Sequence, residues 1–202
     1  MKKADRVQTA AVPAEALEGE FPEIGLPVQP PFPPMEAKSA ERLPAAGRWL
    51  YEPKWDGFRC LAFRKGTDLA LQSKAGQPLD RYFPELRAAF LALPVNTFVL
   101  DGEIIIQGVG GGLDFDALLQ RIHPAESRIR KLSKETPASF YAFDLLVDDQ
   151  GKPLVELPLA ERRERLEKLL GKIPEGSIHL SPSIADRSQA ERWMKELGGA
   201  GL

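Results

Sequence analysis

Residues 51–59 read Tyr-Glu-Pro-Lys-Trp-Asp-Gly-Phe-Arg, and the rest of the predicted domain is organised around this stretch. Strand-like apolar runs at 48–51 and 58–64 flank it, and Asp56-Gly57 is a strong turn signal between them. The pattern predicts a hairpin whose loop holds Lys54 rigidly. An amine held in this way becomes a candidate covalent nucleophile once a nearby cation or burial lowers its pKa from about 10.4.

Two neighbours of the lysine strengthen this hypothesis. Asp56 can orient the amine, and Arg59 offers a planar fork for a phosphate. The alternative is an ordinary hairpin with exposed charges, in which Trp55 and Phe58 belong to the core. Lys-x-Asp-Gly alone does not decide between the two.

The composition restricts the class of protein. The chain has 202 residues, of which 43% are hydrophobic, enough for one domain with a real core. Its single cysteine, Cys60, excludes an internal disulfide and a cysteine-based metal cluster. The formal net charge of -2 means that nucleic-acid binding would need a local basic patch. No apolar run approaches the roughly 20 residues of a membrane span, and the start lacks a signal peptide, so we expect a cytoplasmic protein.

The sequence divides into a tail and a domain. Residues 1–34 hold seven of the 18 prolines, which favours a flexible, extended tail because proline lacks an amide donor and fixes φ. From residue 35 onward we expect an α+β domain in which helices flank antiparallel sheets. The predicted strands cover residues 58–64, 69–73, 99–106 and 139–147. The predicted helices cover residues 82–93, 114–121 and 159–170, with a last one capped by Asp186 and ending near Leu197.

Four short motifs follow one another along the domain: Lys-Trp-Asp-Gly at 54–57, Ser-Lys-Ala-Gly at 73–76, Asp-Gly-Glu at 101–103 and Phe-Tyr-Ala-Phe-Asp at 140–144. In this order they resemble the nucleotide-binding motifs of the covalent nucleotidyltransferases, which include ATP-dependent DNA ligases, RNA ligases and capping enzymes. The flanking text, such as Arg-Tyr-Phe-Pro-Glu-Leu and Gln-Arg-Ile-His-Pro-Ala, is similar to bacterial ATP-dependent DNA ligases of the ligase C type and to the ligase domain of ligase D. The resemblance covers about residues 35–202 and implies an ATP-grasp-like adenylation core.

The resemblance implies a role for each motif residue. Lys54 would attack the α-phosphorus of ATP and form a lysyl-AMP. Glu52 would accept the adenine amino group, and Arg59 would hold the ribose and phosphate end. Glu103 would reach the ribose hydroxyls or a metal ion, unless it is only a strand-edge carboxylate. Phe143 would stack on adenine, unless it belongs to the core.

Two further points come from the same motifs. Strand alternation predicts that Tyr141, Phe143 and Leu145 share one face, opposite to Phe140 and Ala142. The family usually carries arginine followed by asparagine where this chain has Lys74-Ala75. Lysine keeps the charge but loses the two-pronged geometry, so a phosphate contact of Lys74 would be weaker and less directional.

A basic segment follows the glycine-rich connection at 108–112. It contains Arg121, Arg128, Arg130 and Lys131 and has few acidic residues, so it could neutralise the backbone phosphates of duplex DNA. A solvated helix face explains the segment equally well.

The resemblance also implies the reaction of the whole protein. It would seal nicks in duplex DNA during repair, using ATP and Mg²⁺, as a monomer and with DNA end-bridging proteins as candidate partners. Later family motifs and the oligonucleotide-binding (OB-fold) domain are expected beyond Leu202, so the 202 residues alone should seal poorly or not at all. An inactive nucleotide- or DNA-binding remnant, or an RNA ligase or capping-type enzyme, are the alternatives.

Overall fold

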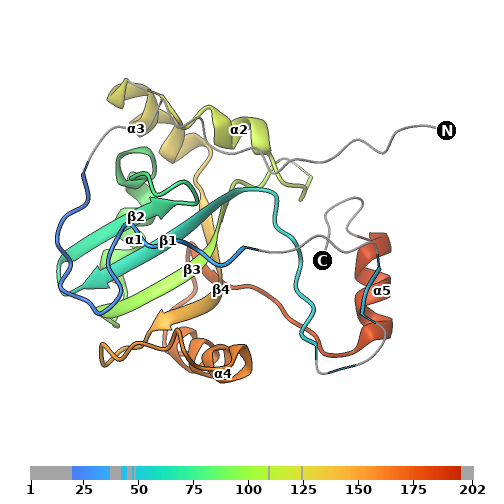
Figure 1. Ribbon diagram of the computed structural model, residues 1–202. Helices are drawn as coiled ribbons and strands as arrows, with labels where there is room; N and C mark the ends of the chain where they lie inside the picture. Colours follow the sequence, from blue (N-terminus) through green and yellow to red (C-terminus); the bar gives the residue numbers. More distant parts are fainter. Residues whose placement is uncertain are drawn as a thin grey trace.

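The structure is a computed structural model that describes residues 20–36, 42–44, 47, 49–108, 110–123 and 125–196. A five-stranded sheet lies at its centre, with the strand order β2-β1-β3-β4-β5 (Figure 1). The strands are β1 (Phe58–Lys65), β2 (Asp68–Ser73), β3 (Thr97–Ile105), β4 (Ser139–Val147) and β5 (Ile178–Leu180). The α-helices are α1 (Pro84–Ala92), α2 (Phe115–Leu119), α3 (Glu126–Glu135), α4 (Leu159–Leu170) and α5 (Arg187–Glu196), and a short 3-10 helix covers Asp80–Tyr82.

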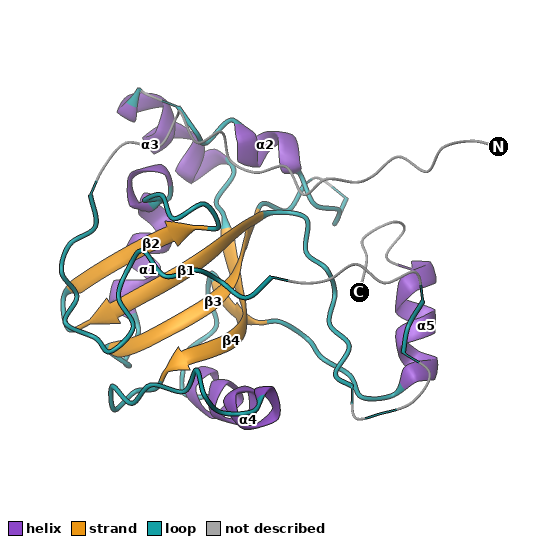
Figure 2. Ribbon diagram, in the orientation of Figure 1, coloured by secondary structure: helices purple, strands orange, loops and turns teal. Residues whose placement is uncertain are grey.

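The pairing of the strands confirms the α+β class (Figure 2). Strand β1 is antiparallel to β2 and β3, and β3 is antiparallel to β4. The last strand, β5, is parallel to β4, so the described residues form a single mixed sheet instead of several antiparallel ones. Strand β5 escaped prediction because three residues carry too little periodicity.

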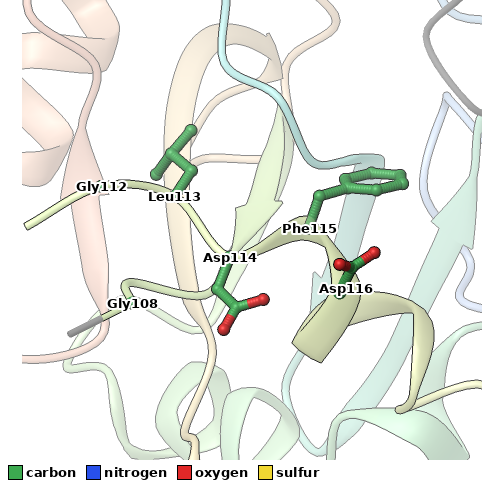
Figure 3. Close-up of a pocket in the computed structure, with 6 residues that line it drawn as sticks. All are labelled: Gly108, Gly112, Leu113, Asp114, Phe115 and Asp116. Atoms are coloured by element: carbon green, nitrogen blue, oxygen red, sulfur yellow. The ribbon is translucent and has the colours of Figure 1, made fainter.

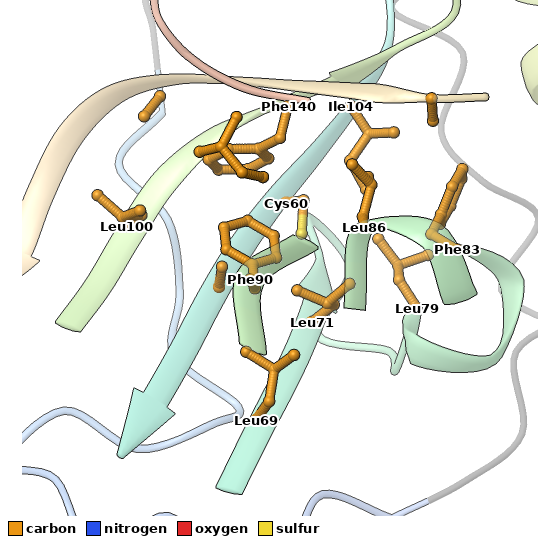
Figure 4. Packing of buried hydrophobic residues seen from close by; sticks show 14 of the residues in the cluster. Cys60, Leu69, Leu71, Leu79, Phe83, Leu86, Phe90, Leu100, Ile104 and Phe140 are labelled. Atoms are coloured by element: carbon orange, nitrogen blue, oxygen red, sulfur yellow. The ribbon is translucent and has the colours of Figure 1, made fainter. Parts of the chain in front are cut away.

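The main core lies between the sheet and the helices. Cys60 from β1, Leu100 from β3 and Phe140 from β4 meet Leu86 and Phe90 of α1 there, and Figure 4 shows how closely these side chains pack.

A glycine in β3 makes part of this packing possible. A Cβ on Gly102 would collide with the Phe140 ring and the Tyr141 carbonyl oxygen, so a larger residue would force β3 and β4 apart.

The opposite face of the sheet is covered by part of the proline-rich segment. Ile24, Leu26 and Val28 are buried in a second cluster that includes Phe63 of β1. The side chain of Gln72 pairs with the backbone of Phe32, accepting its N–H at 2.8 Å and donating to its carbonyl at 2.7 Å.

The prediction of a flexible tail over residues 1–34 is therefore wrong for residues 20–34. This segment forms neither helix nor strand, as expected of proline, but its apolar residues cover the sheet. Residues 1–19 of the predicted tail lie outside the described residues.

Most predicted elements are present. Strand β4 and helix α4 have the predicted bounds. The Asp186 carboxylate accepts a hydrogen bond from the backbone N–H of Gln189 at 2.7 Å, as expected of a residue that caps α5. The predicted hairpin around Lys54 is wrong. Tyr51 instead forms an isolated bridge with Ile184, and residues 52–57 are a loop that leads into β1.

Strand β4 departs from simple alternation at two points, and one of them lies at Phe143. Asp101 pairs with Asp144 while Gly102 pairs with Ala142, so Phe143 is an extra residue in a β-bulge. As a result Leu145 lies in the main core with Phe140, and the prediction that Leu145 shares a face with Phe143 is wrong.

Helix α5 stands apart from the sheet and is joined to it by extended segments (Figure 1). In the described part of the chain, no helix is long and apolar enough to span a membrane.

Candidate functional site

The residues predicted to bind the nucleotide lie toward one end of the sheet, on the face that Ile24, Leu26 and Val28 cover farther along the strands. Arg59 of β1 is the register partner of Glu103 of β3, which in turn pairs with Tyr141 of β4. Side chains of cross-strand partners stand next to one another on the same face. The sheet therefore brings residues of three separate sequence motifs into one row.

Arg59 is held by Asp101. Its Nε donates to Oδ1 at 3.0 Å and its Nη2 to Oδ2 at 2.7 Å, the bidentate geometry that gives strong charge-assisted hydrogen bonds. Burial alone would lower the pKa of Arg59. The hydrogen bonds to Asp101 and the negative charge of Asp101 outweigh the effect of burial, so the pKa of Arg59 is raised. The guanidinium also lies 5.1 Å from the ring centroid of Phe143. Phe143 is half-buried and lies outside both apolar clusters, so the alternative that it belongs to the core is not supported.

Glu103 is a buried carboxyl, and no residue that the structure describes forms a bidentate pair with it. Burial raises the pKa of Glu103 to about 8, although Arg59 and Lys54 oppose this rise and the Gly57 amide donates a hydrogen bond to it. The ionised form thus lacks full compensation from the protein, which fits a carboxylate that meets a cation or hydroxyl donors of a ligand. No group of three or more His, Cys, Asp or Glu side chains able to hold a metal alone occurs in the described residues. Mg²⁺ commonly uses one or two carboxylates together with substrate phosphates, so metal binding by Glu103 stays a prediction.

The loop that carries Lys54 is anchored on its C-terminal side. The Trp55 indole donates to the Ser181 hydroxyl at 3.0 Å, and its ring lies 4.3 Å from that of Tyr141. At Gly57, a Cβ would collide with the Ile104 carbonyl oxygen, so only glycine lets the loop pass this close to β3. Lys54 itself is exposed beside these anchors. The loop is thus as constrained as predicted, although it is not a hairpin turn.

Glu52, on the other side of Lys54, has a partner that sequence reasoning missed. Arg163 of α4 donates from Nη1 to Glu52 Oε1 at 2.7 Å. Burial raises the pKa of Glu52 to about 7, with Arg163 opposing and Asp144 adding to the rise. A signal for Arg163 was present, because Arg163, Leu166 and Leu170 share the buried side of α4 at helical spacing.

Lys74 follows the last residue of β2, which pairs with Cys60, so the sheet places it at the same end as Arg59. It is exposed, and its amine lies 3.5 Å from a carboxylate oxygen of Glu36. Exposed pairs of this kind hold a side chain only weakly. A phosphate contact of Lys74 therefore stays a prediction.

The prediction that Arg121 binds DNA is wrong. Its side chain is 0% exposed, donates to both carboxylate oxygens of Glu85 at 2.7 and 2.8 Å, and donates to the Tyr82 carbonyl at 2.8 Å. The guanidinium also lies 4.9 Å from the Phe83 ring centroid. Arg121 therefore joins α1 to the loop after α2 from inside the core and cannot reach a phosphate.

The other three basic residues predicted to contact DNA, Arg128, Arg130 and Lys131, are exposed on α3. Arg130 pairs with Glu126 at 2.6 Å, and Lys131 lies 3.8 Å from Glu135, both within the helix. Exposed pairs of this kind contribute little and exchange easily for phosphates. DNA contact by these three stays a prediction.

A cavity of about 590 Å³ lies beside the glycine-rich loop (Figure 3). Its lining is Gly108, Gly112, Leu113, Asp114, Phe115 and Asp116. Asp114 accepts the Ala117 amide at 2.8 Å and so caps α2. None of the predicted site residues lines this cavity, so we assign the site to the Lys54 loop and the row of strand residues.

Comparisons with known proteins show what the chain as a whole is similar to. Residues 34–202 match the family model described as "ATP dependent DNA ligase domain". The chain is 50% identical over 184 residues to DNA ligase C of Mycobacterium tuberculosis, covering 88% of this chain and 49% of that protein. It is 45% identical to DNA ligase C1 of Mycolicibacterium smegmatis, covering 89% and 52%. The chain thus spans about half the length of these curated relatives.

Solved structures of DNA ligases also match this chain. The ligase domain of M. tuberculosis LigD matches with a TM-score of 0.56 and 27% identity, over 74% of this chain and 45% of that one. A mycobacterial DNA ligase D complexed with ATP and MES matches with a TM-score of 0.53 and 25% identity, over 74% and 44%.

Proposed function

The chain belongs to the family of ATP-dependent DNA ligases, and on this premise we propose that its site binds ATP and becomes adenylated on Lys54. The observation that carries the proposal is the anchored loop. It presents Lys54 close enough to Glu103 for the amine to lower the pKa of that carboxyl. A positioned nucleophile gains rate because it meets the phosphorus already oriented.

The chemistry at Lys54 is a nucleotidyl transfer. The ammonium first loses one proton, and its nitrogen attacks the α-phosphorus as the bond to pyrophosphate breaks. The nitrogen then loses a second proton, which leaves a phosphoramidate with a neutral nitrogen and one negative charge on the phosphoryl oxygens. Arg59 stands beside this position, and its Nη1 has no hydrogen-bond partner within the described residues. This nitrogen, Nη1 of Arg59, would donate a hydrogen bond to a phosphate oxygen.

The nucleoside would lie over the row of strand residues. Glu52 accepts from Arg163 at one oxygen only, so the other can accept the amino group of adenine. One face of the Phe143 ring meets the Arg59 guanidinium. The opposite face is then left for the adenine ring, at a stacking energy of about 1 kcal/mol.

Glu103, together with phosphate oxygens of ATP, would hold Mg²⁺. The ion would neutralise negative charge that develops on the phosphates. Glu103 is suited to this because its burial leaves the carboxylate in need of a positive neighbour.

The function of the whole protein would be to seal 5′-phosphate, 3′-hydroxyl nicks in duplex DNA. AMP would pass from Lys54 to the 5′-phosphate, and attack by the 3′-hydroxyl would release it. Helix α3 would contact the DNA backbone, and DNA end-bridging repair proteins are candidate partners. We propose a cytoplasmic monomer that acts in DNA repair. The 202 residues alone would bind ATP weakly and have little or no sealing activity.

A chimera tests the proposal. Residues 34–202 replace the matching segment of M. tuberculosis DNA ligase C, and the product is incubated with nicked duplex DNA, ATP and Mg²⁺. We expect sealing by the chimera, loss of sealing on Lys54→Arg, and a rate at least tenfold lower for the 202-residue chain, which is about 1.4 kcal/mol in barrier. A chimera that folds but neither seals nor takes up label from α-labelled ATP would favour the inactive remnant. Label from GTP in preference to ATP would favour a capping-type enzyme.

A further inference from the structure

Arg163 stands out because its guanidinium is fixed independently of the nucleotide site. It is 4% exposed. Besides Glu52, it donates from Nη2 to the Ser181 carbonyl at 2.5 Å and from Nε to Glu167 at 2.9 Å. Each of its three nitrogens therefore has a different partner. The guanidinium of Arg163 is therefore fixed in position, and its hydrogen bond to Glu52 fixes that carboxyl group in turn.

Glu52 is held on one side only. Its Oε1 accepts from Arg163, while no hydrogen bond reaches Oε2 from the described part of the chain. The side chain keeps 30% of its surface exposed. The carboxyl group therefore offers one oxygen to a ligand, and Arg163 sets the direction in which that oxygen points.

The protonation of this oxygen decides which purine it suits. An ionised carboxylate only accepts hydrogen bonds, so it favours the amino group at position 6 of adenine and opposes the carbonyl oxygen at position 6 of guanine. A protonated carboxyl can donate to that guanine oxygen. A site with a neutral Glu52 would therefore lose its preference for adenine.

The charged groups that face Glu52 come from two elements. Arg163 approaches from α4, and Asp144 from β4, where it is itself bonded to Arg162 at 2.8 Å through both carboxylate oxygens. Burial and Asp144 favour the neutral form of Glu52, and Arg163 favours the ionised form. Arg163 is thus the group that opposes protonation of Glu52.

We propose that Arg163 is a positioning residue that sets the purine specificity of the site, because it holds Glu52 ionised and aimed at position 6 of the base. This inference rests on the proposed function, in which Glu52 meets the purine. It adds a specificity determinant on α4, outside the four motifs.

The test measures the affinities of the 202-residue chain for ATP and GTP by calorimetry between about pH 6 and about pH 8. Neither base changes its protonation in this range, and the triphosphate is common to both ligands. The pKa of Glu52 is raised to about 7, so its carboxylate forms as pH rises through this value. The preference for ATP over GTP should therefore grow with pH in the wild type.

Three variants separate charge from shape. Arg163→Met removes the cation at similar volume, so the midpoint of the pH profile should move upward and the ATP/GTP affinity ratio near pH 7.5 should fall about tenfold. Arg163→Lys keeps a cation, so its midpoint should stay near that of the wild type. Lys168→Gln, an exposed change on the same helix, should leave both quantities unchanged. Purine riboside triphosphate, which lacks a group at position 6, should bind Arg163→Met as well as it binds the wild type.

The outcomes are distinct. A wild-type chain with no preference for ATP at any pH would overturn the role of Glu52, and with it this inference. A clear preference that rises with pH but is identical in Arg163→Met would overturn the inference alone. Thermal unfolding shows whether each variant is folded. Should Arg163→Met not fold, Arg163→Gln, whose amide still donates to the Ser181 carbonyl without a charge, carries the same expectation. A wild-type preference that is flat with pH contradicts the inference without any variant.

Discussion

The buried pair of Arg121 and Glu85 gives a sharp prediction about stability. Arg121→Met removes the guanidinium at similar volume and leaves the Glu85 carboxylate with only the Ala138 amide, at 3.1 Å, among its present partners. Breaking a buried ion pair by removing one partner costs about 3–5 kcal/mol. Arg121 Nε is a buried donor without a partner in the described structure, and removing it offsets a small part of this cost. We therefore expect the lower half of the range.

Urea unfolding of the 202-residue chain measures this cost as a free energy, and thermal unfolding measures it as a change in unfolding temperature. For a domain of this size, about 3 kcal/mol corresponds to a drop of roughly 6–12 °C in the unfolding temperature. The double variant Arg121→Met/Glu85→Gln should recover part of the stability, since no unpaired charge remains. Arg128→Met, which changes an exposed arginine on α3, should cost less than about 0.5 kcal/mol. Equal costs for Arg121→Met and Arg128→Met would refute the structural role of Arg121.

Three further predictions concern the site. Phe143→Leu keeps apolar volume but removes the aromatic face, so ATP affinity should fall several-fold at an unchanged unfolding temperature; unchanged affinity in calorimetry would assign Phe143 to packing alone. Gly57→Ala drives a Cβ into the Ile104 carbonyl oxygen, so adenylation of the chimera should fall more than ATP affinity; equal rates for wild type and variant would show that the loop can shift at no cost. Joint replacement of Arg128, Arg130 and Lys131 by glutamine should weaken duplex binding by the chimera. The slope of log affinity against log salt should become shallower by about 0.9 for each DNA phosphate that is no longer neutralised. Lys168→Gln is the control, and an unchanged slope would show that α3 is a solvated face.

Local pattern was enough to predict much of the fold. Strand β4 and helix α4 have the predicted bounds because long segments with a strong hydrophobic period can be assigned from sequence alone. The ion pairs of α4 were only half predictable. Lys168 pairs with Glu164 one turn earlier, a contact that helical spacing favours. Arg165 instead pairs with Asp148, a tertiary partner that no spacing within the helix reveals.

The errors arose where tertiary contacts override local signals. Proline in residues 20–34 predicted a free tail, because nothing local shows that Ile24 and Val28 find an exposed sheet face to cover. Arg121 looked like a DNA contact because charge in a sequence does not show burial, and its partner Glu85 lies 36 residues away. Arg163 was missed for the converse reason, since its link to Glu52 spans 111 residues. The row formed by Arg59, Glu103 and Tyr141 follows from strand register, which a single sequence leaves open.

Peptide mass mapping shows whether Lys54 is the residue that becomes adenylated. The chimera is incubated with ATP and Mg²⁺, digested, and searched for a peptide heavier by one AMP. We expect this mass on the peptide that contains Lys54, its absence in Lys54→Arg, and its persistence in Lys74→Arg. AMP on any other lysine, or AMP retained after Lys54→Arg, would show that Lys54 is not the nucleophile.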